Sequence, residues 1–202
     1  MTDDTSTPAN LWTPRPVEET IDVYRDWAGA YDSDLETFDY RTPDRLTAAL
    51  ARHVAAETTV LDFGCGTGIS GAALLRAGFA HLHGTDVVAE MVEIARDKNL
   101  YDDLWVGAPG AALPRNYDAI VAVGVVSLGA APPETLSLLI RHLTPGGILA
   151  MSFNDPTIEN GTYDAVLDAH VAAGDVALLS REHGPHLAAK DMGSDVIVLR
   201  RG

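Results

Sequence analysis

The chain has 202 residues, 47% of them apolar and 21% charged, which is the size and composition of one ordinary globular domain. Its 14 lysines and arginines stand against 29 acidic residues, and the formal net charge is −15. Nucleic-acid backbones and anionic membranes are bound mainly through lysine and arginine, so we expect neither as a partner.

The first 57 residues predict a tail followed by a helical cap. Residues 1–16 lack apolar periodicity and contain three prolines, which indicates a loosely draped tail. Residues 17–57 predict two helices, over 17–31 and 42–54, because apolar side chains recur there at spacings of three and four. No signal peptide is visible in the N-terminal residues and Cys65 is the single cysteine, so we expect a cytoplasmic protein.

From residue 58 onward, short β-rich runs alternate with helical ones, as in βαβ units. The pattern predicts strands over 59–63, 81–87, 104–106, 117–123 and 148–153, separated by helices over 69–77, 89–98 and 136–143. A helix over 163–171 and two extended runs, 176–181 and 196–200, follow, with the histidines His183 and His186 placed in the loop between them. We therefore expect an α/β fold: one domain with a Rossmann-like core over 58–202. Its doubly wound seven-stranded sheet would be mostly parallel, with an antiparallel C-terminal hairpin and two N-terminal helices.

A glycine-rich loop joins the first predicted strand to the next helix. Gly64, Gly66 and Gly68 alternate with other residues there, which lets the backbone pass close to a ligand. Free N–H groups at the helix start favour ligand binding at the same place. Gly66, Gly68 and Gly71 also fit the dinucleotide pattern, with Asp86 twenty residues after Gly66, so an NAD(P) oxidoreductase is a legitimate alternative.

Asp62, at the end of the first strand, argues against a dinucleotide. A carboxylate repels a pyrophosphate but attracts an ammonium group. The residues therefore favour a nucleoside that carries a positive charge.

Four segments in order resemble the class I S-adenosylmethionine-dependent methyltransferases. They are the glycine loop with Asp62, the second-strand end at Asp86, the fourth-strand stretch from Tyr117 and the turn at Pro145-Gly146-Gly147. Together they cover residues 58–153. Tyr24, Trp27, Tyr31 and Asp32, followed by Tyr40-Arg41-Thr42-Pro43, extend the resemblance to the subfamily named for the Williams-Beuren syndrome region.

The resemblance implies S-adenosylmethionine as cofactor, with S-adenosylhomocysteine as product, and assigns its contacts. Asp62 would hold the amino group, the three glycines would allow close approach, and Asp86 would hold the ribose. Ala108 stands where many relatives have an acid, so backbone contacts at Gly107 would have to recognise adenine. The complete predicted binding set is Tyr31, Arg41, Asp62, Gly64, Gly66, Gly68, Asp86, Val87, Met91, Gly107, Ala108 and Val123.

Within this set, Tyr31 is predicted as a lid over the cofactor and Arg41 as a partner for its carboxylate, although a core residue and a solvated charge are the simpler alternatives. Met91 is predicted as an apolar wall beside adenine. Residues 125–128 and Asn154 would line the acceptor side.

A sulfonium methyl group is already activated, so orientation supplies much of its reactivity, and the sequence identifies no catalytic residue. We expect no metal ion, because no carboxylate or cysteine completes a ligand set with the histidines. The predicted function is in-line methyl transfer to a small-molecule acceptor, with a cofactor-binding module that lacks its own chemistry as a second alternative. Eleven acidic residues against four arginines in residues 1–45 suggest an acceptor that is neutral or cationic.

Overall fold

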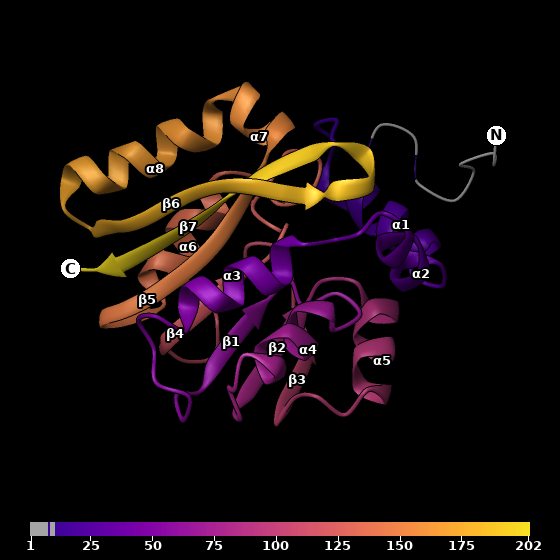
Figure 1. The fold of residues 1–202 in the computed structure, drawn as a ribbon, viewed down its shortest axis with the longest axis horizontal. Coiled ribbons are helices and arrows are strands. Elements are labelled where there is room, and N and C mark those ends of the chain that lie inside the picture. Colours follow the sequence, from indigo (N-terminus) through magenta and orange to yellow (C-terminus); the bar gives the residue numbers. More distant parts are fainter. Residues whose placement is uncertain (1–7, 9–10) are drawn as a thin grey trace.

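The computed structural model describes residue 8 and residues 11–202, so most of the predicted tail lies outside the described residues. A single seven-stranded sheet has the order β3-β2-β1-β4-β5-β7-β6 (Figure 1). The pairs β3-β2, β2-β1, β1-β4 and β4-β5 are parallel, whereas β7 is antiparallel to both β5 and β6. The predicted fold class is confirmed.

The strands are β1 (Val60–Phe63), β2 (Leu82–Asp86), β3 (Asp103–Val106), β4 (Tyr117–Ala122), β5 (Leu143–Asn154), β6 (Val176–Leu187) and β7 (Met192–Arg201). The helices are α1 (Val17–Trp27), α2 (Tyr31–Thr37), α3 (Thr42–Leu50), α4 (Ile69–Arg76), α5 (Ala89–Asp97), α6 (Glu134–Arg141), α7 (Asp155–Asn160) and α8 (Thr162–Ala173). A short 3-10 helix, Ala188–Lys190, separates β6 from β7. Within the described part of the chain, no helix is long and apolar enough to cross a membrane.

The centre of the sheet is covered on both faces, as the continuous apolar run of β4 predicts. On one face, Leu46 of α3 and Leu74 of α4 pack with Val121. On the other, Leu139 of α6 and Leu167 of α8 pack in the cluster that contains the alternate residues of β4. The parallel strands therefore present their carboxyl ends at one edge, where ligands of such sheets bind.

In the described part of the chain, three helices precede β1, whereas the sequence predicts two. The predicted helix over 17–31 ends at Trp27, and a separate helix begins at Tyr31, with Gly29 in the turn between them. Gly29 disfavours a continuous helix because glycine loses the most backbone freedom on folding. Helix α3 belongs to the layer over the sheet, so only α1 and α2 form the cap above its carboxyl edge (Figure 1).

The C-terminal hairpin is longer than the predicted runs over 176–181 and 196–200. Strand β6 continues through Gly184-Pro185 to Leu187, and β7 begins at Met192. His183 and His186 therefore lie on a strand, which corrects their predicted place in a loop. The isolated bridge between Tyr40 and Leu187 brings the end of β6 beside the start of α3.

The predicted helix over 163–171 is confirmed as α8, but the sequence misses a short helix before it. Two helices, α7 and α8, follow β5, and Gly161 with φ of +73° separates them. The side chain of Asn154 caps α7 by accepting the Thr157 N–H at 3.1 Å.

Candidate functional site

The glycine loop lies at the carboxyl end of β1, where its three glycines all have positive φ: +69° at Gly64, +52° at Gly66 and +93° at Gly68. The N–H groups of Gly64 and Cys65 donate to the Thr85 carbonyl of β2 at 2.8 and 3.0 Å, which fixes the loop to the sheet. A Cβ at Gly66 would meet nothing within 4 Å. The backbone of Gly66 thus faces open space where a ligand can approach closely.

Asp62 is fully buried beneath this loop. Its Oδ2 accepts hydrogen bonds from Ser70 Oγ and Tyr101 OH, both at 2.7 Å, whereas no described residue is a partner for its Oδ1. Burial, with a smaller contribution from the Asp86 charge, raises the pKa of Asp62 to about 6 against the two hydrogen bonds, which lower it. A buried carboxylate oxygen without a partner is costly, so the arrangement fits a ligand that brings a cationic N–H donor.

Tyr101 is a site residue that the sequence did not identify. Its ring passes between α4 and β2, because a Cβ at Gly71 would lie 2.3 Å from its hydroxyl and one at Gly84 would lie 3.0 Å from its ring. Gly71 is the third glycine of the dinucleotide pattern. Here that glycine makes room for Tyr101, which accounts for the pattern without a dinucleotide.

Asp86 connects the glycine loop to the end of β2. Its Oδ2 accepts the Gly66 N–H and its Oδ1 accepts the Val88 N–H, both at 2.9 Å. Burial raises its pKa, while these backbone hydrogen bonds act in the opposite direction. Each carboxylate oxygen keeps a lone pair for one further donor, which suits a pair of adjacent hydroxyls.

The predicted adenine contacts surround Asp86, at the ends of β2 and β3. Gly107 donates its N–H to the Asp86 carbonyl at 2.8 Å, Ala108 next to it is exposed, and Val87 is half-buried. Met91 is 1% exposed and packs with Val88 and Ala28 between α5 and the cap. The structure thus gathers these residues at one end of the site.

Val123 lies farther along the same edge, where β4 ends. Its side chain is half-buried against the cluster that also contains Val60 and Val121. The Val123 side chain therefore contributes to the core beside the site, and its predicted contact with the cofactor stays a prediction.

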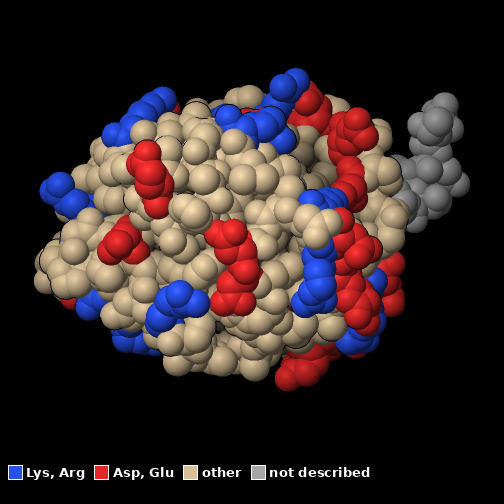
Figure 2. All heavy atoms as spheres, turned by 90° about the horizontal axis from the view of Figure 1, so that it is seen from below, with Lys and Arg blue, Asp and Glu red and all other residues tan. Residues whose placement is uncertain are grey.

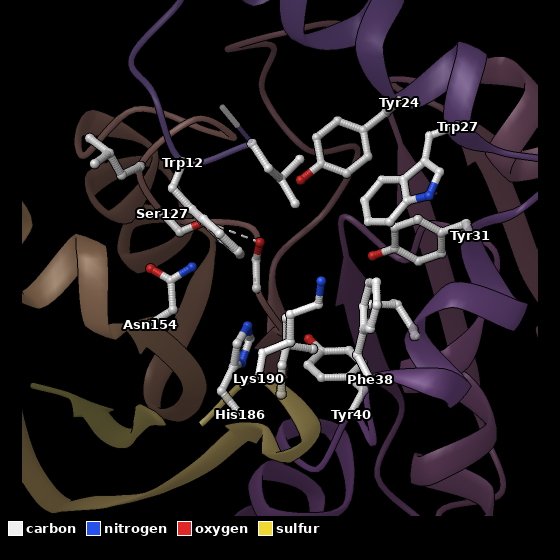
Figure 3. Close-up of a pocket in the computed structure, with 15 residues that line it drawn as sticks. Trp12, Tyr24, Trp27, Tyr31, Phe38, Tyr40, Ser127, Asn154, His186 and Lys190 are labelled. Carbon is white, nitrogen blue, oxygen red and sulfur yellow. Dashed lines mark hydrogen bonds between the residues drawn. The ribbon is translucent and has the colours of Figure 1, made fainter. Parts of the chain in front are cut away.

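A second part of the site is a pocket between the cap and the carboxyl ends of β4 and β5, shown in Figure 3. Aromatic side chains from α1, α2 and the segment before α3 form one side of it, and Trp27 and Tyr31 meet edge to face at 4.7 Å between ring centroids. The lining is Leu11, Trp12, Tyr24, Trp27, Tyr31, Leu35, Phe38, Tyr40, Gly124, Ser127, Leu128, Asn154, His186, Leu187 and Lys190. Ser127, Leu128 and Asn154, predicted for the acceptor side, are therefore brought together with Tyr31.

The pocket lining is apolar or donor-rich. Burial raises the pKa of Tyr24 to about 12 and raises those of Tyr31 and Tyr40 as well, so all three hydroxyls stay protonated at neutral pH. Among the described residues that line the pocket there is a lysine and no carboxylate. Figure 2 shows acidic side chains gathered on the outside near the N-terminal end, so the acidity of the N-terminal segment gives no indication of the acceptor's charge.

Asp32 attaches the cap to the glycine loop. Its Oδ1 accepts a hydrogen bond from Thr67 Oγ1, and its Oδ2 pairs with Lys98 Nζ, each at 2.5 Å. Nearby, Trp27 Nε1 donates to Asp34 at 2.7 Å. Helix α2 is thereby joined to the glycine loop and to the end of α5.

Arg41 is exposed and already has a partner. Its guanidinium pairs with Asp39 at 2.6 Å, and the side chain is 57% exposed. The predicted contact of Arg41 with the cofactor carboxylate stays a prediction. Within the described residues, no group of three histidine, cysteine or acidic side chains is arranged to hold a metal ion.

Known protein sequences match parts of this chain. A family model described as a methyltransferase domain matches residues 32–192. Methyltransferase-like protein 27 of Homo sapiens is 37% identical over 145 residues, which are 66% of this chain and 57% of that protein. A ribosomal protein L11 methyltransferase of Chromohalobacter salexigens is 35% identical over 121 residues, 57% of this chain and 38% of that protein. The chain thus spans only part of the length of these relatives.

Solved structures with this fold include methyltransferases. A complex of the Haloferax volcanii Trm112 methyltransferase activator with a putative methyltransferase matches with a TM-score of 0.66 and 23% identity, over 92% of this chain and 97% of that one. An S-adenosylmethionine-dependent methyltransferase of Geobacter sulfurreducens, bound to S-adenosyl-L-homocysteine, matches with a TM-score of 0.56 and 17% identity. This match covers 80% of this chain and 92% of that one. Since the family model spans most of the chain and the fold agrees, the chain belongs to the methyltransferase domain family, as a class I S-adenosylmethionine-dependent methyltransferase.

Proposed function

We propose that this protein transfers the methyl group of S-adenosylmethionine to a small molecule bound in the aromatic pocket. The observation that carries the proposal is Asp62, a buried carboxylate beside an open glycine loop, with one oxygen lacking a partner among the described residues. S-adenosylmethionine supplies an activated methyl group on a sulfonium, together with an ammonium group that would complement Asp62.

Each end of the site has a defined task in this proposal. Asp62 Oδ1 accepts from the amino group, while Ser70 and Tyr101 hold the carboxylate in place. Asp86 accepts from the two ribose hydroxyls with its remaining lone pairs, and Met91 and Gly107 border adenine. The open face at Gly66 lets the cofactor lie directly against the backbone, because a side chain there would occupy the approach.

The aromatic pocket supports a small acceptor. It is bounded by the cap and by the strand ends at Gly124 and Asn154, and it encloses only about 50 Å³. That space suits one or two water molecules, so an acceptor must displace aromatic side chains of the cap to enter. Related L11 methyltransferases are named for a protein substrate. A folded protein would need a far wider opening of this pocket than a small molecule.

Orientation is the main contribution that the protein would make to the transfer. The cap excludes water, and the pocket walls hold the acceptor in line with the transferred group. The Tyr24, Tyr31 and Tyr40 hydroxyls stay protonated at neutral pH, so they serve as hydrogen-bond donors and not as bases.

Calorimetry with S-adenosylmethionine, S-adenosylhomocysteine and NAD⁺ tests the cofactor. We expect both sulfur nucleosides to bind and NAD⁺ not to bind. Asp62→Asn should weaken S-adenosylhomocysteine binding by about 10- to 150-fold, since a charged hydrogen bond contributes about 1.5–3 kcal/mol. The exposed Asp102→Asn, at the other end of the sheet, is the matched control. Preferential binding of NAD⁺, or an unchanged affinity in Asp62→Asn, contradicts the proposal.

Turnover with methyl-labelled S-adenosylmethionine separates an enzyme from a binding module. A panel of small metabolites is compared with a panel of ribosomal proteins, and label transfer is measured in each. We expect transfer to a small molecule. Transfer only to protein would keep the cofactor assignment and reject the acceptor class, and tight cofactor binding with no transfer to either panel would favour the module.

A further inference from the structure

A buried chain of hydrogen bonds runs from Arg45 to the pocket. Arg45 Nη1 donates to Ser194 Oγ at 3.1 Å, Ser194 Oγ lies 2.9 Å from Thr42 Oγ1, and Thr42 Oγ1 lies 2.8 Å from His186 Nδ1. At the start of α3, Arg41 occupies the cap position and no side-chain cap bond forms. The Thr42 hydroxyl is used instead to join α3 to the hairpin.

Counting protons shows which atom donates in each of these hydrogen bonds. Ser194 Oγ accepts from a cation that cannot give up its charge, so the Ser194 hydroxyl proton is directed to Thr42 Oγ1. Thr42 then donates its own proton to His186 Nδ1. In the reverse direction the Ser194 proton would have no acceptor among the described residues. This assignment by network places the ring proton of His186 on Nε2.

His186 is neutral at physiological pH. Burial lowers its pKa to about 4; the Arg45 charge lowers it further, while Asp155 acts in the opposite direction. The side chain is 6% exposed and stands edge to face with Tyr40, 5.1 Å between ring centroids. A neutral ring with its proton on Nε2 is a hydrogen-bond donor at that atom and not a base.

The Nε2 side of His186 lines the pocket. Figure 3 shows the imidazole directed into the same space as the Asn154 amide. Asn154 Oδ1 is already occupied by Thr157, accepting from its N–H at 3.1 Å and from its hydroxyl at 2.5 Å. The Asn154 Nδ2 group is therefore a second donor on this wall, and the described residues provide no hydrogen-bond acceptor for His186 Nε2.

We propose that His186 Nε2–H and Asn154 Nδ2–H together bind a carbonyl or carboxylate oxygen on an aromatic acceptor molecule. This inference rests on the proposed function, because it names the class of its acceptor. The rings of Tyr24, Tyr31, Phe38 and Tyr40 suit a flat aromatic body, and the carboxylate-free lining accommodates an oxygen with partial or full negative charge. His186 binds and positions the acceptor.

Nitrogen NMR of the imidazole tests the tautomer in the wild-type protein without any ligand. At pH 7, long-range ¹H–¹⁵N correlations should give His186 Nε2 the shift of a protonated nitrogen and Nδ1 that of an unprotonated one. Thr42→Val, which removes the donor to Nδ1, should weaken this preference. A ring protonated on Nδ1, or on both nitrogens, overturns the proposal whatever the variants do.

Binding of benzoate, acetophenone and benzylamine to the protein saturated with S-adenosylhomocysteine tests the acceptor class. We expect benzoate and acetophenone to move the His186 Nε2 signal and benzylamine to leave it unchanged. His186→Phe should weaken benzoate binding about tenfold, with S-adenosylhomocysteine affinity within twofold of wild type. His183→Gln is the matched control, since that residue lies on the same strand but is 60% exposed and pairs with Asp195.

The two possible failures are distinguishable. A large loss of S-adenosylhomocysteine affinity in His186→Phe overturns the inference and places His186 at the cofactor. A stronger response to benzylamine than to benzoate overturns it as well. If S-adenosylhomocysteine does not bind the wild-type protein at all, the proposed function fails. The tautomer measurement and a benzoate titration without nucleoside then still test whether His186 and Asn154 bind an oxygen.

Discussion

The two ends of the site are built differently. At the cofactor end, Asp62, the glycine loop and Asp86 lie within 25 residues of one another and are held mainly by backbone hydrogen bonds. At the acceptor end, Tyr40, Gly124, Asn154 and His186 come from four distant segments and meet only in the folded chain. The first end is a local feature of one βαβ unit, whereas the second depends on the whole fold.

This difference also reverses the electrostatics. Asp62 is a buried carboxylate, and its charge is stabilised either by a proton or by a positively charged ligand. The cofactor end therefore favours a cation. His186 is a buried imidazole that resists protonation, and the wall that it shares with Asn154 favours an oxygen acceptor. One site thus presents opposite preferences at its two ends, as expected when a cationic cofactor meets a neutral or anionic acceptor.

Stability against pH should separate the two ends most clearly. The raised pKa of Asp62, about 6 against an ordinary 3.8, makes the folded state hold a proton that the unfolded state has lost. Asp62 therefore contributes stability below about pH 4 that is lost as the pH rises to about 6. The lowered pKa of His186, about 4 against 6.5, contributes stability above about pH 6.5 that is lost as the pH falls toward 4. Each effect is about 3 kcal/mol.

Urea unfolding between pH 4 and pH 7 measures both effects. The free energy of unfolding of Asp62→Asn relative to wild type should rise with pH, and that of His186→Phe relative to wild type should fall with pH. Saturating S-adenosylhomocysteine should reduce the Asp62 effect, because its amino group compensates the carboxylate. Two difference curves with the same slope would contradict the contrast between the ends.

Gly71→Ala tests whether Tyr101 depends on the small residue above it. A Cβ at position 71 would lie 2.3 Å from the Tyr101 hydroxyl, so the ring must move and Asp62 must lose a donor. We expect a loss of about 1–3 kcal/mol in the free energy of unfolding and weaker cofactor binding. In the Tyr101→Leu background the same substitution should cost much less.

The corresponding control is Gly78→Ala. A Cβ there would meet nothing within 4 Å, although φ of +99° strains the backbone. It should therefore lower stability without changing S-adenosylhomocysteine affinity. If Gly71→Ala has the same effect in the wild-type protein and in the Tyr101→Leu background, the proposed packing role of Gly71 is wrong.

The sequence predicts the glycine loop and the places of the parallel strands along the chain, because each depends on residues close in the chain. It predicts the C-terminal hairpin but makes both of its strands too short, for a physical reason. Gly184-Pro185 resembles a loop, but β6 is the edge strand and Pro185 lies beside a register shift, where its missing N–H is tolerated. Because of that error, the sequence does not place His186 in the pocket beside Asn154, the other donor of the proposed acceptor site. Tyr101 escapes notice because its contact with Asp62 spans 39 residues.

Asp32→Asn should loosen the cap that covers both ends. The substitution removes the charge that pairs with Lys98 and weakens the bond to Thr67, each 2.5 Å from the carboxylate. Because the pair is partly exposed, we expect an effect of about 1 kcal/mol, seen as release of S-adenosylhomocysteine about fivefold faster. Stopped-flow tryptophan fluorescence measures the rate. Glu36→Gln, exposed on the same helix, should leave it unchanged.

Arg41→Ala should have the smallest effect on stability and on cofactor affinity. It tests whether Arg41 belongs to the cofactor end of the site. The guanidinium is paired with Asp39 and exposed to solvent, so its removal should change the free energy of unfolding by less than about 0.5 kcal/mol. Because Asp39 already pairs with the guanidinium, S-adenosylhomocysteine affinity should stay within twofold of wild type. An affinity loss of tenfold or more would mean that Arg41 leaves Asp39 when the cofactor binds. The acceptor-side segment before α3 would then contribute a charge to the cofactor end, and the separation of the two ends would not hold.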